Sequence, residues 1–274
     1  MEITGTLIPE WARRAEERGF STLATIDRIV YPSYDSLTTL SVAAGATTRI
    51  GLFPNILLAP VYPPVLLAKT TASLQAMSGG RLTLGLGVGG RPDDFAAAAR
   101  PFNERGRLMD ETLDLMRRAW AGQPVTGDEL PVAPTAGPDA RVPVLIGGTA
   151  DAAVRRTVQY GDGWTAGGGS PDMAAPMIER IRQAWRDGGR DGEPRIAALV
   201  YYGFGDDEVS RATLRNYYSF LGEWVDAVVE GAVRTPAAAK DTARAFEDVG
   251  VTELVFDPTV GSIDEVDRLA DAVL

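Results

Sequence analysis

The sequence predicts an α/β barrel, and three observations lead to this fold class. Short apolar segments alternate with amphipathic ones along almost the whole chain, a pattern typical of parallel strands joined by helices. Two of the apolar segments run into glycine, at Gly85–Gly90 and at Gly147-Gly148, where backbone can approach a ligand closely. The length of 274 residues suits one barrel, which ordinarily takes about 250.

The expected strands and helices follow one another with little else between them. Gly19 ends the first helix, Pro63-Pro64 opens another, and Arg105–Ala121 has apolar residues at helical spacing. We expect strands at 21–26, 49–58, 81–87, 143–147, 163–166, 195–204 and 253–257. We expect helices at 10–19, 34–47, 63–77, 105–121, 150–160, 172–187, 207–233 (with a break), 236–249 and 263–274.

This count leaves a barrel of eight strands one strand short. The only room for the missing strand is Met1–Leu7, where Glu2-Ile3-Thr4-Gly5 is weakly strand-like. A doubly wound open sheet is the alternative, but no Gly-x-Gly-x-x-Gly turn opens the first strand–helix unit. We therefore expect a TIM (β/α)8 barrel with the first strand short or missing. Residues 1–274 are expected to form a single domain with an irregular insertion at about 122–142.

Composition excludes several kinds of chemistry. The chain has no cysteine and no histidine, which rules out a Ser-His-Asp triad, a disulfide and any thiolate or imidazole metal site. We expect no metal, and proton transfer is left to Asp, Glu, Tyr, Lys, Arg, water or a cofactor. The net charge of −10 argues against a nucleic-acid partner. No apolar stretch reaches the roughly 18 residues that cross a bilayer, so we expect a cytoplasmic chain without a membrane partner.

Several motifs occur in an order that agrees with one family. They are Ala12–Phe20 continuing to Asp27, Thr48–Leu52 with Ala59–Lys69, Leu74–Gly87, and Ile146–Thr149 followed by Tyr160–Trp164. Together these runs resemble the bacterial luciferase-like family, whose members are flavin- or deazaflavin-dependent oxidoreductases. The resemblance extends from about residue 10 to about residue 190. Beyond that point only the strand–helix alternation agrees.

The resemblance implies a TIM barrel with the flavin or deazaflavin ring over the carboxyl ends of the strands. The family supports this ring on a bulge with a non-prolyl cis peptide, and the matching bond is Pro54–Asn55. An ordinary trans bulge is the alternative. The cofactor phosphate maps onto Gly147, Gly148 and Thr149, where backbone N–H groups and the helix dipole favour an anion. Alternatively, Thr149 caps its own helix.

The same resemblance places six further residues near the cofactor. The alternatives are an ordinary glycine-rich loop for the first three, a solvated side chain for the arginine and packing within a strand for the last two. They are Gly87, Val88 and Gly89 beside the ring, Arg107 near the phosphate or tail, and Thr165 and Ala166 at the edge of the pocket.

The family pattern fails at two positions that bear on catalysis. After the second strand the family commonly has an acidic residue and a histidine, whereas this chain has Asp27-Arg28. Before Pro63 the family often has another histidine, and here Tyr62 stands. Arg28 can fix an anionic substrate or a developing oxyanion, Asp27 can act as a base, and Tyr62 can donate a proton. A solvated or salt-bridged carboxylate is the alternative for Asp27.

We expect an oxidoreductase that uses coenzyme F420 for hydride transfer to or from a small organic substrate. Hydride and flavin-peroxide chemistry reside in the cofactor, so a site without histidine can still catalyse them. One alternative is an FMN-dependent monooxygenase that uses a flavin peroxide. The other is a degenerate barrel without catalysis that binds a ligand or partner. A homodimer is expected from the family resemblance alone.

Overall fold

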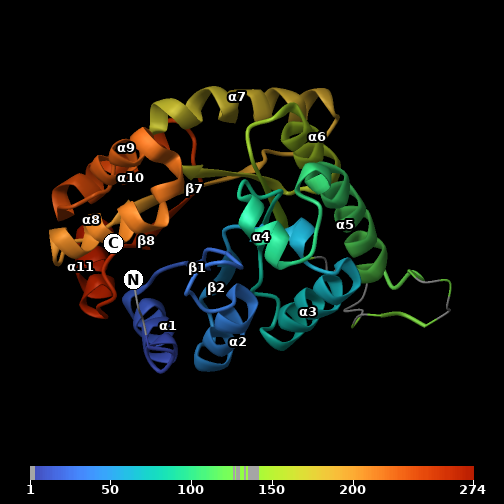
Figure 1. The fold of residues 1–274 in the computed structure, drawn as a ribbon, viewed down its shortest axis with the longest axis horizontal. Helices are drawn as coiled ribbons and strands as arrows, with labels where there is room; N and C mark the ends of the chain where they lie inside the picture. The colour runs from blue at the N-terminus through green and yellow to red at the C-terminus, as the bar shows by residue number, and fades with distance from the viewer. Residues whose placement is uncertain (1–3, 126, 128–129, 133, 135–141) are drawn as a thin grey trace. The chain divides into compact units, whose positions relative to one another are not determined.

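A computed structural model describes residues 4–125, 127, 130–132, 134 and 142–274 (Figure 1). The chain falls into two compact units. The first unit comprises Thr22–Asp162, and the second unit combines Met1–Ser21 with Gly163–Leu274. The second unit therefore contains both ends of the chain. The expected single domain stays a prediction.

The first unit is built on short parallel strands. They are β1 (Thr22–Thr25), β2 (Gly51–Pro54), β3 (Leu57–Leu58), β4 (Leu84–Gly87) and β5 (Val144–Gly147). β1 pairs with β2, while β4 pairs with β3 on one side and β5 on the other. A bridge between Leu52 and Leu82 joins β2 to the segment that leads into β4. All four residues of β4 are buried, as expected for a parallel strand covered on both faces.

The helices of the first unit begin at residues that favour helix starts. Asp35 caps the first of them, since its side chain accepts a hydrogen bond from the Thr38 N–H at 2.7 Å. Proline occupies the first helical position of two others, at Pro64 and Pro92. The helices are α2 (Ser36–Ala46), η1 (Ala59–Val61), α3 (Pro64–Met77), α4 (Pro92–Ala97), η2 (Phe102–Glu104), α5 (Arg105–Trp120) and α6 (Asp151–Tyr160).

The second unit repeats the alternation of parallel strands and helices. Its strands pair in chain order, and they are β6 (Gly163–Gly168), β7 (Arg195–Tyr202) and β8 (Glu253–Pro258). Its helices are α1 (Leu7–Arg18), α7 (Pro171–Asp187), α8 (Asp207–Tyr217), η3 (Ser219–Trp224), α9 (Val225–Glu230), α10 (Pro236–Asp248) and α11 (Asp264–Val273). In Figure 1, α10 and α11 lie beside β8.

Two kinds of contact hold the second unit together. Tyr202 of β7 is buried in a cluster with Val233, Ala239 and Leu269, which ties that face of the strand to the helices. Near the surface, an Arg14–Asp267 ion pair of 2.5 Å connects α1 with α11. The amino-terminal helix is thus held by the carboxyl-terminal one.

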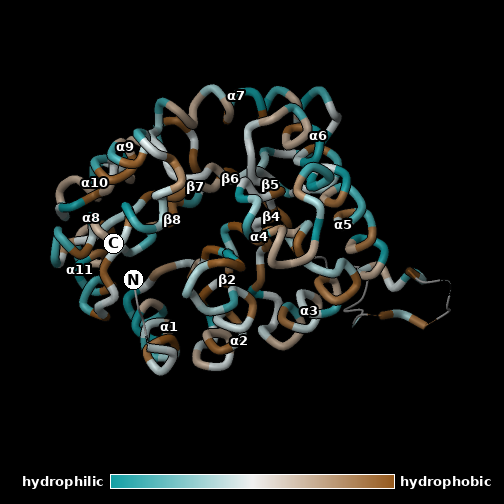
Figure 2. Tube along the Cα trace, viewed as in Figure 1, coloured by the Kyte–Doolittle hydropathy of each residue, from teal (hydrophilic) through white to brown (hydrophobic). Residues whose placement is uncertain are grey.

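Hydrophobic residues concentrate in the strands, and the long helices alternate between apolar and polar residues along their length (Figure 2). This is the pattern of helices that cover a buried sheet with one face and meet water with the other. Within the described ranges, no helix combines the length and apolar character needed to span a membrane.

The structure divides one segment that was expected to be continuous and one that was expected to contain a break. The strand expected at 49–58 separates into β2 and β3 around a bulge at Asn55-Ile56. The helical stretch expected at 207–233 separates into α8, η3 and α9, with Gly222 in a non-helical conformation at φ 56°. Helix α4 was not expected at all, because the sequence around it contains too short an apolar pattern.

Two expectations fall partly outside the described residues. Residues 1–3 of the weak first strand lie outside them, and α1 already begins at Leu7. The described residues of the 122–142 insertion contain neither helix nor strand.

Candidate active site

The bulge between β2 and β3 contains a cis peptide bond, and it joins Asn55 to Ile56. The expected position, Pro54–Asn55, is therefore wrong by one residue. The reason lies in strand pairing, because Pro54 pairs with Thr25 and the Asn55 N–H still donates to the Thr25 carbonyl at 2.7 Å. Extended backbone thus continues through Pro54–Asn55, and the chain leaves the ladder only after Asn55.

Glycines of β4 and β5 leave room for this bulge. A Cβ at Gly87 would lie 2.0 Å from the Ile56 Cδ1, and one at Gly147 would lie 3.3 Å from the Ile56 Cγ2. A Cβ at Gly85 would lie 2.6 Å from the Pro54 carbonyl oxygen. Ile56 therefore fills the space above Gly87 that the sequence suggested for a ligand. We call Gly85, Gly87 and Gly147 the glycine floor.

Asp27 anchors the other end of the bulge. It follows β1 directly and is buried, and its Oδ2 accepts a hydrogen bond from the Leu58 N–H at 2.9 Å. Its Oδ1 accepts a second one from the Tyr62 hydroxyl at 2.8 Å. Burial raises the pKa of Asp27 to about 6, and burial together with the Asp27 charge raises the pKa of Tyr62 above its ordinary range. The structure thus brings two predicted catalytic residues together, with both Asp27 oxygens engaged.

Arg28, the third predicted catalytic residue, turns toward α4 instead. Its Nε donates to the Asp94 Oδ2 at 2.7 Å, and its Nη2 donates to the Asp93 Oδ2 at 3.1 Å. Asp94 is buried and also accepts hydrogen bonds from the backbone N–H groups of Ile29 and Val30. These contacts fix the loop after β1, and the substrate-binding role of Arg28 stays a prediction.

Sequence reasoning missed the part that α4 plays in this anchor. The signal was present, because Pro92 followed by two aspartates is a typical helix start. The helix has only six residues, which is too short for apolar periodicity to reveal.

The predicted phosphate loop is exposed and leads into a helix without a side-chain cap. Gly148 has a φ of 112°, which favours glycine, and Thr149 and Ala150 are exposed. The N-cap of α6 is Ala150, and no side chain caps the helix there. The alternative in which Thr149 caps α6 is therefore wrong. The positive end of the α6 dipole is open to an anion, although Asp151 in the first turn reduces that attraction.

An ion pair holds α6 against α5. The Nε of buried Arg156 donates to Asp110 at 2.7 Å, and its Nη2 donates to the Gly106 carbonyl at 2.8 Å. Exposed Arg155 adds a contact of 3.0 Å to the same carboxylate. The hydrogen bond from Arg156 lowers the pKa of Asp110 below its usual range. Asp110 thereby helps to position the start of α6.

The remaining residues predicted to touch the cofactor differ in exposure and in the element that carries them. Arg107 is exposed and pairs with Glu104 and Glu111 of its own neighbourhood. Gly89 has a φ of 74°, and a Cβ there would meet Leu58 at 3.2 Å. Half-buried Val88 lies between it and the glycine floor. In the second unit, Thr165 is buried in β6 and Ala166 is half-buried beside it, next to an irregularity in the pairing with β7.

One group in the second unit was missed entirely. Asp257 lies in β8 opposite Tyr201 of β7, and the Tyr201 hydroxyl lies 2.6 Å from the Tyr218 hydroxyl. Burial raises the pKa of Asp257 to about 7. Because Asp257 belongs to no recognisable motif within β8, nothing in the sequence pointed to it.

Comparison with known proteins decides the family. A family model described as luciferase-like monooxygenase matches residues 5–272 of the chain. The chain belongs to the luciferase-like monooxygenase family. This luciferase-like chain is 32% identical to protein Rv0940c of Mycobacterium tuberculosis over 227 residues, which are 73% of this chain and 78% of that protein.

Two solved structures share the fold. An F420-dependent secondary alcohol dehydrogenase in complex with an F420-acetone adduct matches with a TM-score of 0.83 and 19% identity, covering 98% of this chain and 94% of that one. The oxygenating constituent of 3,6-diketocamphane monooxygenase from Pseudomonas putida, in complex with FMN, matches with a TM-score of 0.74 and 15% identity over 98% and 90% of the chains. The predicted α/β TIM-barrel fold class is thereby confirmed.

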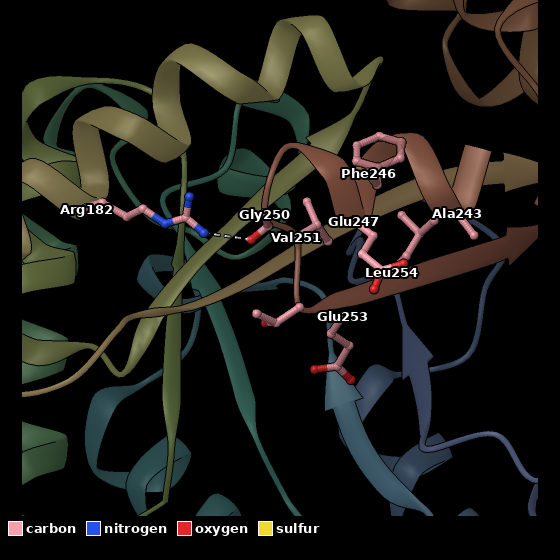
Figure 3. A pocket seen from close by; sticks show the side chains of 9 residues that line it. Arg182, Ala243, Phe246, Glu247, Gly250, Val251, Glu253 and Leu254 are labelled. Carbon is pink, nitrogen blue, oxygen red and sulfur yellow. Dashed lines mark hydrogen bonds between the residues drawn. The ribbon is translucent and has the colours of Figure 1, made fainter. Parts of the chain in front are cut away.

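A surface pocket of this luciferase-like chain lies at the amino end of β8 (Figure 3). Arg182 reaches into it from α7 and donates to the Gly250 carbonyl at 3.2 Å, while Glu253 stands at the start of β8. TIM-barrel enzymes carry their active sites at the carboxyl ends of the strands. The pocket therefore lies at the opposite end of β8 from the one at which TIM-barrel enzymes bind their substrates, and Asp257 lies near the carboxyl end of the strand.

Proposed function

We propose that the chain is a coenzyme F420-dependent oxidoreductase that transfers a hydride to or from a small organic substrate. The observation that carries the proposal is the exposed loop Gly148–Ala150, which opens onto the N-terminus of α6 without a side-chain cap. The family and the structural likeness to an F420-dependent alcohol dehydrogenase support it.

The loop suits the phosphate of such a cofactor. Gly148 adopts a backbone conformation that favours glycine, and Ala150 offers no side chain to compete for the first N–H groups of α6. A phosphate accepts hydrogen bonds from such groups and is favoured by the helix dipole. The Arg156–Asp110 pair keeps α6 in place for this contact.

The bulge suits the support of a flat ring. Ile56 rests on the glycine floor, and Asp27 holds the segment after it through the Leu58 N–H. The bound cofactor would supply the hydride, so the chain needs only to hold the ring, admit the substrate and manage one proton.

FMN is the second candidate cofactor, because the same loop suits its phosphate and a monooxygenase constituent of similar fold is solved in complex with FMN. The two cofactors lead to different chemistry. An FMN monooxygenase consumes oxygen in proportion to product, whereas a deazaflavin enzyme does not.

Titration of the purified chain with F420 and with FMN, followed by fluorescence, tests the proposal. We expect F420 to bind more tightly than FMN. The variant Ala150→Asp places a carboxylate at the N-cap, where it stabilises α6 but repels a phosphate. It should therefore keep the melting temperature while weakening F420 binding at least about tenfold, a change of about 1.4 kcal/mol.

The matched control is Ala150→Ser, which caps the helix without adding charge. This variant should bind F420 far better than the aspartate variant does. Equal F420 affinity in wild type and Ala150→Asp would show that the phosphate lies elsewhere. Failure of both cofactors to bind would favour a barrel without catalysis.

A further inference from the structure

Asp27 and Tyr62 both follow the carboxyl ends of strands in the first unit. Asp27 comes shortly after β1 ends at Thr25, and Tyr62 follows η1, which begins directly after β3. TIM-barrel enzymes bind and convert their substrates at this end of the strands. The unit Thr22–Asp162 also carries the bulge and the Gly148–Ala150 loop, so the pair and both parts of the proposed cofactor site belong to one compact unit.

Two kinds of contact hold Tyr62 in a fixed position against Asp27. Its hydroxyl donates to the Asp27 Oδ1 at 2.8 Å, while the other carboxylate oxygen accepts from the Leu58 N–H at 2.9 Å. Its ring packs against an apolar cluster of Leu58, Val61 and Phe95. The carboxylate and the phenol are therefore fixed relative to each other and to the bulge, and they lie at the distance that proton transfer requires.

Tyr62 is the more accessible member of this pair. Asp27 is only 5% exposed, whereas Tyr62 is half-buried. A phenolic oxygen that donates one hydrogen bond can still accept another. A substrate hydroxyl would therefore bond to the Tyr62 oxygen, and Asp27 would act on the substrate through Tyr62.

The charges around the pair place the titration on Asp27. Burial raises the pKa of Asp27 to about 6, against the opposing effect of its two hydrogen bonds. Asp35 at the N-terminus of α2 and Asp94 of α4 add to this rise through their charges, and Arg28 is bound to Asp94. Burial and the Asp27 charge raise the pKa of Tyr62 above its ordinary range, so the phenol does not ionise by itself near neutral pH. A proton that leaves Tyr62 must therefore be replaced in the same step.

We propose that Tyr62 is a catalytic residue that exchanges a proton with the substrate oxygen, and that Asp27 is the positioning residue that takes up or returns this proton behind it. This role rests on the hydride-transfer function proposed above. During alcohol oxidation, the substrate O–H bond breaks and a new O–H bond forms at Tyr62, whose own proton moves to the Asp27 Oδ1. The carbinol carbon gives its hydride to the oxidised deazaflavin, which is reduced. The relay returns the proton to solvent after the ketone leaves.

The relay gives the two directions of the reaction opposite pH dependences. Oxidation of a bound alcohol needs an ionised Asp27 to accept the proton, so its rate should rise with pH through about 6. Reduction of a bound ketone needs a protonated Asp27 to supply the proton, so its rate should fall with pH through the same value. A carboxylate that only anchored the bulge would change both rates in the same direction as it titrates.

Infrared titration of the chain without cofactor tests the hydrogen-bonded pair directly. Subtracting the spectrum of the matching Asp27→Asn chain isolates the carbonyl stretch of protonated Asp27, which should disappear near pH 6. Tyr62→Phe removes a hydrogen bond that favours the carboxylate, so the midpoint should move up by about 0.5 pH units or more. Exposed Tyr34 provides the matched control, and Tyr34→Phe should leave the midpoint unchanged. An unchanged midpoint in Tyr62→Phe would overturn the proposal.

Single-turnover oxidation or reduction of F420 gives the second measurement, with a panel of small secondary alcohols and their ketones. Tyr62→Phe should lower the rate about 100-fold or more in both directions, while F420 affinity changes less than about threefold. Asp27→Asn keeps an oxygen for the Leu58 N–H but cannot take up a proton, so the inflection near pH 6 should vanish from both rates. Tyr34→Phe should retain the wild-type rates and both inflections.

The two proposals fail in different ways. Wild type that binds no F420, or that binds it and reduces or oxidises nothing in the panel, contradicts the hydride-transfer function and with it the relay. Wild type that turns over while Tyr62→Phe keeps its rate contradicts the relay alone, and so does an inflection near pH 6 that survives in Asp27→Asn. Parallel loss of rate and F420 affinity in Tyr62→Phe would assign Tyr62 a structural role instead.

Discussion

At the scale of single residues, the packing of Ile56 explains why glycine occupies the ends of β4 and β5. Glycine at a strand end commonly indicates close approach of a ligand, and the sequence led to that interpretation. In the structure, Gly85 and Gly87 instead leave room for Pro54 and Ile56 of the chain itself. A ligand contact at this place would therefore be made through the bulge, which the glycines support.

Substitution of Gly87 tests this arrangement. Gly87→Ala would put its Cβ 2.0 Å from the Ile56 Cδ1, so Ile56 must move, and we expect a loss of about 1–3 kcal/mol in the free energy of unfolding. Adding Ile56→Val, which removes the clashing methyl group, should recover part of the loss. Urea unfolding of both variants measures it.

Gly90→Ala is the control, because nothing lies within 4 Å of a Cβ at Gly90. Its unfolding free energy should stay within about 0.5 kcal/mol of wild type. A Gly87→Ala chain as stable as the Gly90→Ala chain would contradict the packing of Ile56 on the glycine floor.

At the scale of elements, an ion pair between buried Arg156 and half-exposed Asp110 positions the helix of the proposed phosphate site. Arg156 fastens α6 to α5 through Asp110 and the Gly106 carbonyl, and exposed Arg155 reaches the same carboxylate. The two arginines are neighbours in sequence and share a partner, but they differ in burial. A hydrogen bond made by a buried charged group contributes more to stability than an exposed ion pair does.

Replacing each arginine by methionine should separate these cases. We expect Arg156→Met to lower the free energy of unfolding by about 1–3 kcal/mol and to weaken F420 binding, because α6 loses the hydrogen bonds of Arg156 to Asp110 and to the Gly106 carbonyl. Arg155→Met should cost less than about 1 kcal/mol and leave binding unchanged. Thermal unfolding and F420 fluorescence measure both effects. Equal losses of unfolding free energy in the two variants would show that the burial of Arg156 does not strengthen its contribution to stability.

The elements were largely predictable, because apolar periodicity and the proline and glycine boundaries repeat from β1 to α11. What failed was local and depended on tertiary contacts. The position of the cis bond follows from the Asn55 N–H pairing with Thr25, which no single-chain pattern encodes. Helix α4 matters because Asp94 binds the loop that carries Arg28, a contact between residues more than 60 positions apart.

At the scale of the whole molecule, the absence of histidine makes proton binding unusually simple. No side chain of the unfolded chain titrates between about pH 5.5 and pH 7.5, where histidine would otherwise dominate. In the folded chain, Asp27 and Asp257 titrate in or near this window, because burial raises the pKa of these groups to about 6 and about 7.

A potentiometric titration should therefore show that, at about pH 5.5, the folded chain binds about two more protons than the urea-unfolded chain. Since the folded state binds more protons, its stability should fall as pH rises from about 5 to about 8. The double variant Asp27→Asn/Asp257→Asn should remove both effects. Superimposable curves for folded and unfolded wild type would contradict the raised pKa values of both groups.

The location of Asp257 marks the limit of sequence reasoning at this scale. The fold class followed from alternation along the chain, and the family followed from ordered motifs. The environment of Asp257 required the register between β7 and β8, because Asp257 and Tyr201 are 56 positions apart in the sequence and meet only in the sheet.

The contacts of the bulge have a consequence for how a cofactor would bind. Ile56 rests on glycines, Asp27 holds Leu58, and both sets of contacts come from the chain itself. The bulge proposed to support the ring is thus preorganised, because its conformational entropy is already lost on folding. Cofactor binding should then proceed as a rigid docking with a single kinetic phase. The bulge should be equally resistant to proteolysis with and without the bound cofactor.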